Sequence, residues 1–256
     1  MVETAPASRV HACLVAGGKY HDIDFARREL LGLLGEHDQA RVTVRDDWED
    51  TEMLATAEVI VSYTCDVRPS EPAQQMIRSW VERGGRLVAL HGTNAALDLP
   101  RPGGVEAPRC FPLWADTLGS QFIAHPPIGP FRVENCSPAH WLVAGIDDFV
   151  ATDELYLMHH PDPEHLEVLL QTQWHGEAAG FAEADWTIGT GEHAVQYLRP
   201  LGVGAVLYNT LGHCRGHYDM LPLKDYHPTV ERCSWELPEY YELLRRAIRW
   251  ALGATA

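Results

Sequence analysis

The chain has 256 residues, of which 46% are hydrophobic, and this is enough to bury one sizeable core. A formal net charge of −16 disfavours binding to nucleic acid and a polybasic contact with a membrane. The sequence has no apolar run of about 18 residues and no visible signal peptide, so no transmembrane helix is expected. We expect a single domain over residues 1–256.

The first 95 residues alternate between strand patterns and helix patterns. Apolar runs predict strands at 9–18, 40–45, 58–63 and 86–91. Apolar stripes and capping residues predict helices at 24–35, at 50–57 and from Ser70 to the Gly84-Gly85 pair. This alternation is typical of βαβ units in a parallel sheet.

The second half is less regular. Strand patterns occur at 130–135, 166–172, 194–199 and 204–210, and helix patterns at 111–119 and about 237–252. Residues 99–108 have the composition of a Pro/Gly loop, and residues 174–193 that of a long loop or lid. The sequence thus predicts an α/β fold with a doubly wound, mostly parallel, flavodoxin-like sheet flanked by helices, and a long irregular insertion in the second half.

Polar residues follow the apolar strands at the edge where open parallel sheets bind ligands. His21, His91 and His213 follow the first, fourth and last strands, and Asp66 follows the third. A sheet needs no imidazole at these places for its stability, so we interpret the convergence as a site. The structural alternatives are a solvated loop histidine for His21 and a turn cap before Ser70 for Asp66.

The stretch His91-Gly92-Thr93-Asn94 directly follows an apolar strand, as in a nucleophile elbow, but it contains neither cysteine nor serine. We predict that His91 takes part in catalysis and that Gly92, Thr93 and Asn94 contribute to substrate binding. No G-x-G-x-x-G, Walker or H-E-x-x-H motif is present, so no nucleotide cofactor is expected. The six scattered cysteines lack a C-x-x-C pair, which favours reduced thiols in a cytoplasmic protein over a zinc ribbon.

Five blocks, in order, resemble the ThuA-like (trehalose utilisation) family, whose fold is like class I glutamine amidotransferases and flavodoxin. The blocks are GGRLVALHG, FPLWADTLGSQFIAHP, SPAHWLVAGIDDFVATDELY, GVGAVLYNTLGH and YYELLRRAIRWALG. The resemblance adds His125 and the pair Asp153-Glu154 to the candidate site, and it implies the use of sugars. Tyr156 is an aromatic candidate for stacking on a sugar ring, whereas Trp114 fits a core position better.

These residues form three candidate groups. The predicted catalytic residues are His91, Glu154 and His213; the predicted substrate-binding residues are His21, Asp66, Gly92, Thr93, Asn94 and Tyr156; the predicted metal ligands are His91, His125 and His213. The leading hypothesis is an enzyme acting on a sugar or an oxidised (keto) glycoside, either with a divalent metal, zinc first, or by metal-free acid–base chemistry.

Two alternatives remain open for the function. One is a non-catalytic sugar-binding or accessory protein. The other is an amidotransferase-like hydrolase with a relocated nucleophile; Cys65 and Cys214 lie near other strand ends, but neither is in the elbow. In every case the expected partner is a small molecule, and the sequence permits a homo-oligomer without requiring one.

Overall fold

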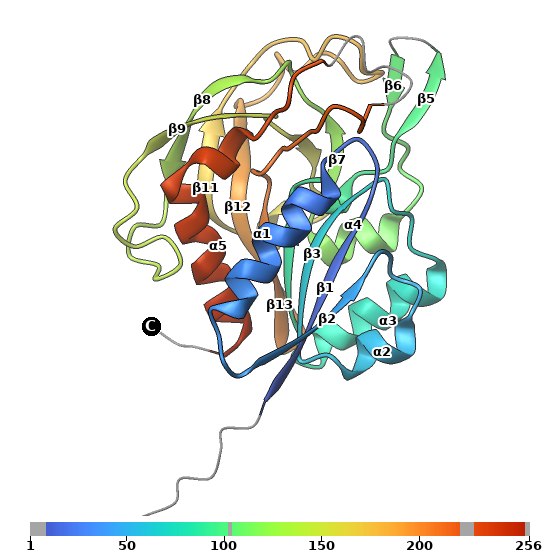
Figure 1. Ribbon diagram of the computed structural model, residues 1–256. Coiled ribbons are helices and arrows are strands. Elements are labelled where there is room, and N and C mark those ends of the chain that lie inside the picture. Colours follow the sequence, from blue (N-terminus) through green and yellow to red (C-terminus); the bar gives the residue numbers. More distant parts are fainter. Residues whose placement is uncertain (1–8, 102–103, 221–227, 254–256) are drawn as a thin grey trace, which may run out of the picture.

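A nine-stranded sheet forms the centre of the protein, and its strands lie in the order β2-β1-β3-β4-β13-β12-β11-β8-β9 (Figure 1). The computed structural model describes residues 9–101, 104–220 and 228–253. The predicted α/β fold with a doubly wound sheet flanked by helices is confirmed. No helix in the described ranges is both long and apolar enough to cross a membrane.

The first five strands in this order are parallel to one another. They are β2 (Ala40–Arg45), β1 (Val10–Gly18), β3 (Val59–Cys65), β4 (Arg86–Leu90) and β13 (Gly204–Asn209). Alternate residues of β1 belong to different cores: Leu14 packs into the core on one face and Val15 into the core on the other. Such strands are apolar throughout because both faces are covered, and this is why the sequence shows them as continuous apolar runs.

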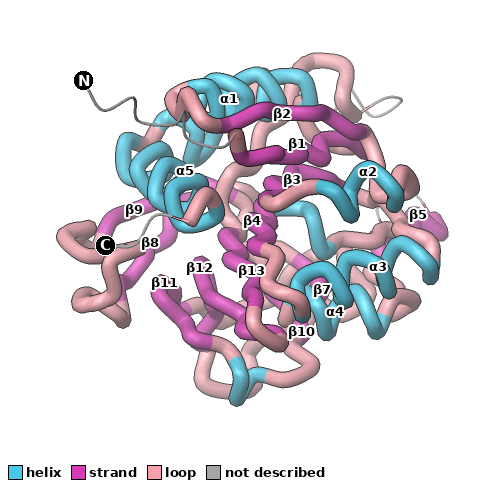
Figure 2. The backbone as a smooth tube through the Cα atoms, turned by 90° about the horizontal axis from the view of Figure 1, so that it is seen from below, coloured by secondary structure: helices cyan, strands magenta, loops and turns pink. Residues whose placement is uncertain are grey.

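Helices cover both faces of the parallel strands, as Figure 2 shows. One face carries α1 (Ile23–Gly35) and α5 (Pro238–Ala251); the other carries α2 (Thr51–Thr56), α3 (Glu71–Glu82) and α4 (Pro112–Leu118). The predicted caps are present, because the side chains of Asp50 and Ser70 accept hydrogen bonds from the backbone at the starts of α2 and α3.

The other end of the sheet is antiparallel. Its strands are β12 (Glu192–Leu201), β11 (Glu167–Gln173), β8 (Gly129–Asn135) and the edge strand β9 (Phe149–Asp153). A separate pair consists of β7 (Gln121–Ala124) and β10 (Leu157–His159), with short 3₁₀ turns at η2 (Pro163–His165) and η3 (Cys233–Glu236). The sequence did not predict β7, β9 and β10, because three to five residues are too few to show a period.

The prediction that residues 99–108 form an irregular Pro/Gly loop is partly wrong. Two short strands, β5 (Asp98–Arg101) and β6 (Gly104–Glu106), pair antiparallel there, while residues 102 and 103 lie outside the described ranges. The predicted irregular segment is confirmed for residues 174–191, and its last two residues, Glu192 and His193, begin β12.

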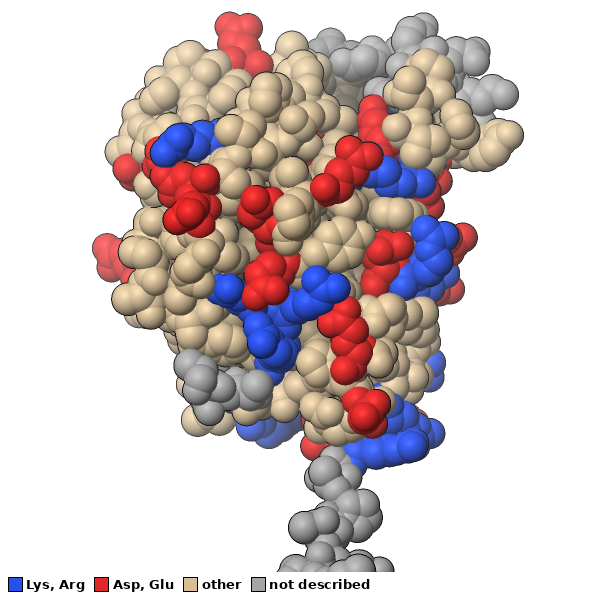
Figure 3. Space-filling view, turned by 60° about the vertical axis from the view of Figure 1, so that its left-hand side comes forward, with Lys and Arg blue, Asp and Glu red and all other residues tan. Residues whose placement is uncertain are grey.

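Charges on the surface are mixed in sign. Figure 3 shows one face on which acidic side chains border the basic ones. Ion pairs such as Arg245 with Glu36 and Arg246 with Glu242 occur among the described residues. This face therefore offers no uniformly basic surface of the kind that binds nucleic acid.

Candidate functional site

The chain turns sharply where β4 ends. His91 is the first residue after the strand and has a positive φ of 43°, and η1 (His91–Asn94) is a single 3₁₀ turn. The hydroxyl of Tyr208 donates a hydrogen bond to the carbonyl of His91 and holds this backbone in place. A residue other than glycine rarely adopts such a φ, and strained backbone of this kind gathers at functional sites.

Four side chains meet at this edge of the sheet. His21, His91, Glu154 and His213 each place one ligand atom within 4.8 Å of the others. All four residues are buried, with exposed fractions of 0 to 6%. We call them the His/Glu cluster. His21, His91 and His213 follow parallel strands, and Glu154 follows the edge strand β9.

Backbone carbonyls determine which nitrogens of two histidines carry a proton. Nδ1 of His91 lies 2.7 Å from the carbonyl of Thr210, and Nδ1 of His21 lies 3.2 Å from the carbonyl of Lys19. A carbonyl only accepts, so both Nδ1 atoms donate and both neutral rings carry their lone pair on Nε2. The two Nε2 atoms lie 2.9 Å apart, so both lone pairs are directed to one place.

A carboxylate orients the ring of His213. Its Nε2 donates to Glu231 over 2.8 Å, which leaves Nδ1 facing the cluster. Nδ1 is fully buried, lies 3.2 Å from Oε1 of Glu154 and makes no hydrogen bond among the described residues. An unsatisfied buried nitrogen is costly, and here it is directed at the same centre as the other two rings.

The carboxylate of Glu154 closes the cluster. Oε2 lies 3.5 Å from Nε2 of His91 and 3.9 Å from Nε2 of His21. Oε1 lies 3.4 Å from the guanidinium of Arg215 and 3.6 Å from Nε2 of His125. Burial would raise the pKa of Glu154, but the neighbouring His125 and His213 rings outweigh it and hold this pKa well below its ordinary value.

The histidines respond to their surroundings in opposite directions. Burial, with the rings of His91 and His213 nearby, lowers the pKa of His21 well below its ordinary value. Burial also opposes the charged form of His213, but the carboxylates of Glu154 and Glu231 outweigh it and raise the pKa of His213 to about 9. Opposite shifts among adjacent buried groups are typical of a functional site.

The predicted metal set of His91, His125 and His213 needs a correction. His21 takes the place assigned to His125 and Glu154 joins the group, whereas His125 lies outside the cluster. The Nδ1 atom of His125 bonds to the carbonyl of Pro126, and a quarter of its side chain is exposed. The sequence around His125 does not indicate on which side of Glu154 the imidazole ring lies.

The side chains of two predicted substrate-binding residues, Thr93 and Asn94, bond to groups outside the cluster. A binding role for the backbone N–H groups of Gly92 and Thr93 stays a prediction. The hydroxyl of Thr93 lies 2.7 Å from that of Ser62 and donates to the carbonyl of Leu90. The amide of Asn94 donates to Ser120. Gly92 is needed for close packing, because a Cβ there would come within 2.8 Å of Cys65.

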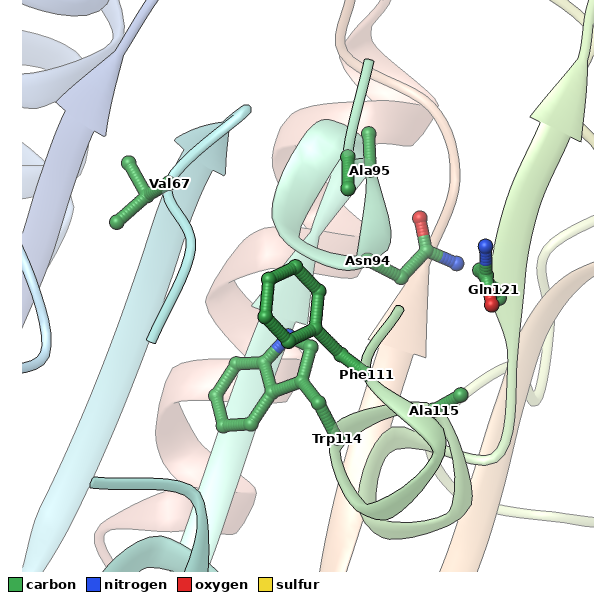
Figure 4. A pocket seen from close by; sticks show the side chains of 8 residues that line it. Val67, Asn94, Ala95, Phe111, Trp114, Ala115 and Gln121 are labelled. Carbon is green, nitrogen blue, oxygen red and sulfur yellow. The ribbon is translucent and has the colours of Figure 1, made fainter. Parts of the chain in front are cut away.

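Figure 4 shows Asn94 beside a small cavity that Phe111, Trp114 and Gln121 also line. The cavity volume is about 10 Å³, which is room for about one water molecule and not for a sugar. Trp114 packs against Trp48 in the core, as predicted.

Asp66 is also engaged within the protein. Its carboxylate pairs with Lys19 and Arg68 and accepts a hydrogen bond from the backbone of Leu97. It therefore holds the chain at Leu97 and, through the side chain of Arg68, also contacts the segment before Ser70. Tyr156, in contrast, reaches the cluster, with its hydroxyl 3.1 Å from Nε2 of His91.

Two residues at the site were not predicted. Glu231 bonds to His213, and Arg215 pairs with both Glu231 and Glu154. Neither belongs to a motif: Arg215 is in a glycine-containing loop, and Glu231 is 18 residues from His213. A larger cavity of about 340 Å³ lies beside the cluster and shares His21 as a wall, together with Gly17, Gly18, Asp22, Ile23, Asp24, Arg27, Asp46 and Asp219.

Comparisons with known proteins agree with this architecture. A ThuA-like protein from Bacteroides uniformis ATCC 8492 superposes with a TM-score of 0.66 at 18% identity, covering 98% of this chain and 94% of that one. A ThuA-like protein from Parabacteroides merdae ATCC 43184 gives 0.63 at 15% identity, with 96% and 91% covered. A β-galactosidase from Bacillus circulans sp. alkalophilus gives 0.55 at 12% identity, with 96% and 31% covered. At these identities the likeness shows the fold alone.

No curated protein matches the chain in sequence. The family described as "ThuA: Trehalose utilisation" matches residues 13–225, which is most of the chain and includes the four members of the His/Glu cluster. The chain therefore belongs to the ThuA family, which is associated with trehalose utilisation.

Proposed function

We propose that the chain is an enzyme of carbohydrate metabolism that acts on a sugar or an oxidised (keto) glycoside, with a divalent metal, zinc first, held by the His/Glu cluster. The family association supports the substrate class. The observation that carries the proposal is the convergence of three imidazole nitrogens and one carboxylate on a single buried centre.

The hydrogen bonds around the cluster fit a metal. Each ring uses its other nitrogen to donate to a carbonyl or a carboxylate, which is the usual outer arrangement of metal-binding histidines. Two lone pairs facing each other over 2.9 Å repel in the neutral rings, and a cation between them would remove that repulsion.

The distances fit as well. Four ligands at about 2.1 Å from zinc lie about 3.4 Å from one another in a tetrahedron. The Nε2 atoms of His21 and His91 lie 2.9 Å apart. Oε2 of Glu154 lies 3.5 Å from Nε2 of His91 and 3.9 Å from Nε2 of His21, and Oε1 lies 3.2 Å from Nδ1 of His213. One ligand atom from each of the four residues lies within 4.8 Å of the others. Small movements of the side chains would therefore complete the coordination.

A bound divalent metal supplies a Lewis acid that polarises a carbonyl or lowers the pKa of water. The chain's own residues do the remaining work in this proposal. The Tyr156 hydroxyl faces the cluster and is placed to bind a polar oxygen of the substrate. Of the cluster residues, His21 lines the adjacent cavity, which offers a small molecule a place beside this ring.

Metal analysis of the purified protein tests this proposal. Protein prepared with zinc and then freed of excess metal should hold about one zinc ion per chain, and His91→Ala should hold little. His165→Ala is the matched control, because His165 is exposed and pairs with Asp162 away from the cluster. Wild-type protein without stoichiometric metal would contradict the metal-dependent function.

A second candidate function uses the same residues for acid–base chemistry without metal. Its support is His125, whose partly exposed ring lies 3.6 Å from the buried Glu154 and could pass a proton to solvent. Turnover of a keto sugar that survives a strong chelator would favour this candidate. Loss of sugar binding in His91→Ala, with no turnover in the wild type, would favour an accessory protein.

A further inference from the structure

The carboxylate of Asp153 lies directly behind the His/Glu cluster. It is fully buried, and among the described residues it accepts hydrogen bonds from four backbone N–H groups. Oδ1 accepts from Glu154 at 2.8 Å and from His213 at 3.1 Å. Oδ2 accepts from Gly212 at 2.9 Å and from Ser234 at 3.2 Å. An ionised carboxylate can accept about four such bonds, so this one is saturated.

These bonds connect parts of the protein that the sheet keeps apart. Strand β9, which ends at Asp153, is the edge strand, and β8, β11 and β12 lie between it and β13. The turn after β13 carries His213. No strand pairing joins β9 to β13 in the described ranges, yet Oε1 of Glu154 and Nδ1 of His213 lie 3.2 Å apart. Arg215 joins the two through a side chain, because it pairs with Glu154 from the loop that carries His213. Asp153 joins them through the backbone, because it accepts from the N–H groups of both Glu154 and His213.

We propose that Asp153 is a positioning residue for the metal centre: its four backbone hydrogen bonds set the distance between the ligands Glu154 and His213. This inference rests on the metal-dependent function proposed above. Asp153 itself does not touch the metal. It acts through the backbone of the two ligand-bearing residues, in the way that hydrogen bonds behind a metal site orient its ligands.

Asp153→Asn tests the proposal, because the shape is kept while one carboxylate oxygen becomes an NH₂ group. That group would face two N–H donors, so the turn at Gly212 and His213 must shift. We expect zinc affinity, measured by competition with a chromogenic chelator, to fall about 10- to 100-fold. We also expect the visible spectrum of the cobalt-substituted protein to change, since this spectrum reports ligand geometry.

Asp148→Asn is the matched control. Asp148 also accepts a backbone N–H, from Asn135, and pairs with Arg132, but it does not contact the cluster. This variant should keep the zinc affinity and the cobalt spectrum of the wild type.

The melting temperature separates positioning from general stabilisation. A positioning residue should reduce the increase in melting temperature that zinc produces, whereas a purely structural residue lowers the melting temperatures of the metal-free and zinc-loaded protein equally. An unchanged zinc affinity and cobalt spectrum in Asp153→Asn would overturn the proposal. If wild-type protein binds no metal, both this inference and the metal-dependent function fail; wild-type binding with an unaltered variant defeats only the inference.

Asp153→Glu is the second variant in case the first does not fold. It keeps the charge and displaces the carboxylate by one methylene, and we expect weaker zinc binding again. If both variants remain unfolded even with zinc, Asp153 is a residue of the fold and the proposal is wrong.

Discussion

The parallel and antiparallel halves of the sheet contribute to the His/Glu cluster in different ways. The parallel strands β1, β4 and β13 lead directly to His21, His91 and His213, because the carboxyl ends of parallel strands share one edge. The antiparallel half contributes Glu154 from its outermost strand, β9. A parallel sheet thus gathers residues by its topology, whereas an edge strand needs added connections. The backbone hydrogen bonds to Asp153 and the ion pair between Arg215 and Glu154 supply them.

Removing a ligand from the parallel half should have the largest effect. His213→Ala deletes the unsatisfied Nδ1 and should weaken zinc binding by on the order of 100-fold or more, since a lost ligand costs more than a lost outer hydrogen bond. Competition with a chelator measures this affinity, and His165→Ala is again the control. Zinc affinity equal to that of the wild type would show that the three histidines do not act together.

A smaller loss is expected when only the support of a ligand changes. Glu231→Gln keeps the size of the side chain but removes the charge that accepts from Nε2 of His213. We expect zinc affinity to fall about 10-fold, at the low end of the range for such partners. The exposed Glu236, changed to Gln, is the control. If both variants bind zinc equally, Glu231 has no supporting role.

The turn after β4 can be tested through stability. Gly92→Ala would place a Cβ within 2.8 Å of the Thr64 carbonyl and of Cys65, and should reduce the free energy of unfolding by about 1–3 kcal/mol. Gly32→Ala in α1 meets nothing within 4 Å and should stabilise by about 0.5–1 kcal/mol. Urea unfolding measures both. A Gly92→Ala protein of normal stability would show that the packing around residue 92 can accept a Cβ.

Thiol alkylation should have the smallest effect on function. Cys110 and Cys136 are exposed and should react first, whereas burial raises the pKa of Cys214 to about 12 and burial of Cys65 also raises its pKa. Mass spectrometry of the native protein should therefore find early modification at the two exposed sites, with zinc content unchanged. Rapid modification of Cys65 or Cys214, accompanied by loss of activity, would revive the hydrolase with a relocated nucleophile.

Sequence patterns located most of the strands and three of the four cluster residues from the chain alone, and the family resemblance added Glu154. The patterns could not show that the ring of His21 faces the cluster and that of His125 does not. The direction of each ring depends on a hydrogen bond to a backbone carbonyl, that of Lys19 for His21 and that of Pro126 for His125. Nor could they show that Thr93 and Asn94 face the core. A residue's place after a strand shows that it is near the edge, but not where its side chain points.

The sequence by itself determined the alternation of strands and helices, and with it the edge at which His21, His91 and His213 gather, because strands covered on both faces must be apolar throughout. Only the tertiary structure decided that these rings direct their free nitrogens at one point and that Glu154 lies among them. The physical reason is that the deciding hydrogen bonds, from Thr210, Glu231 and Asp153, join residues far apart in sequence, and no local pattern records them.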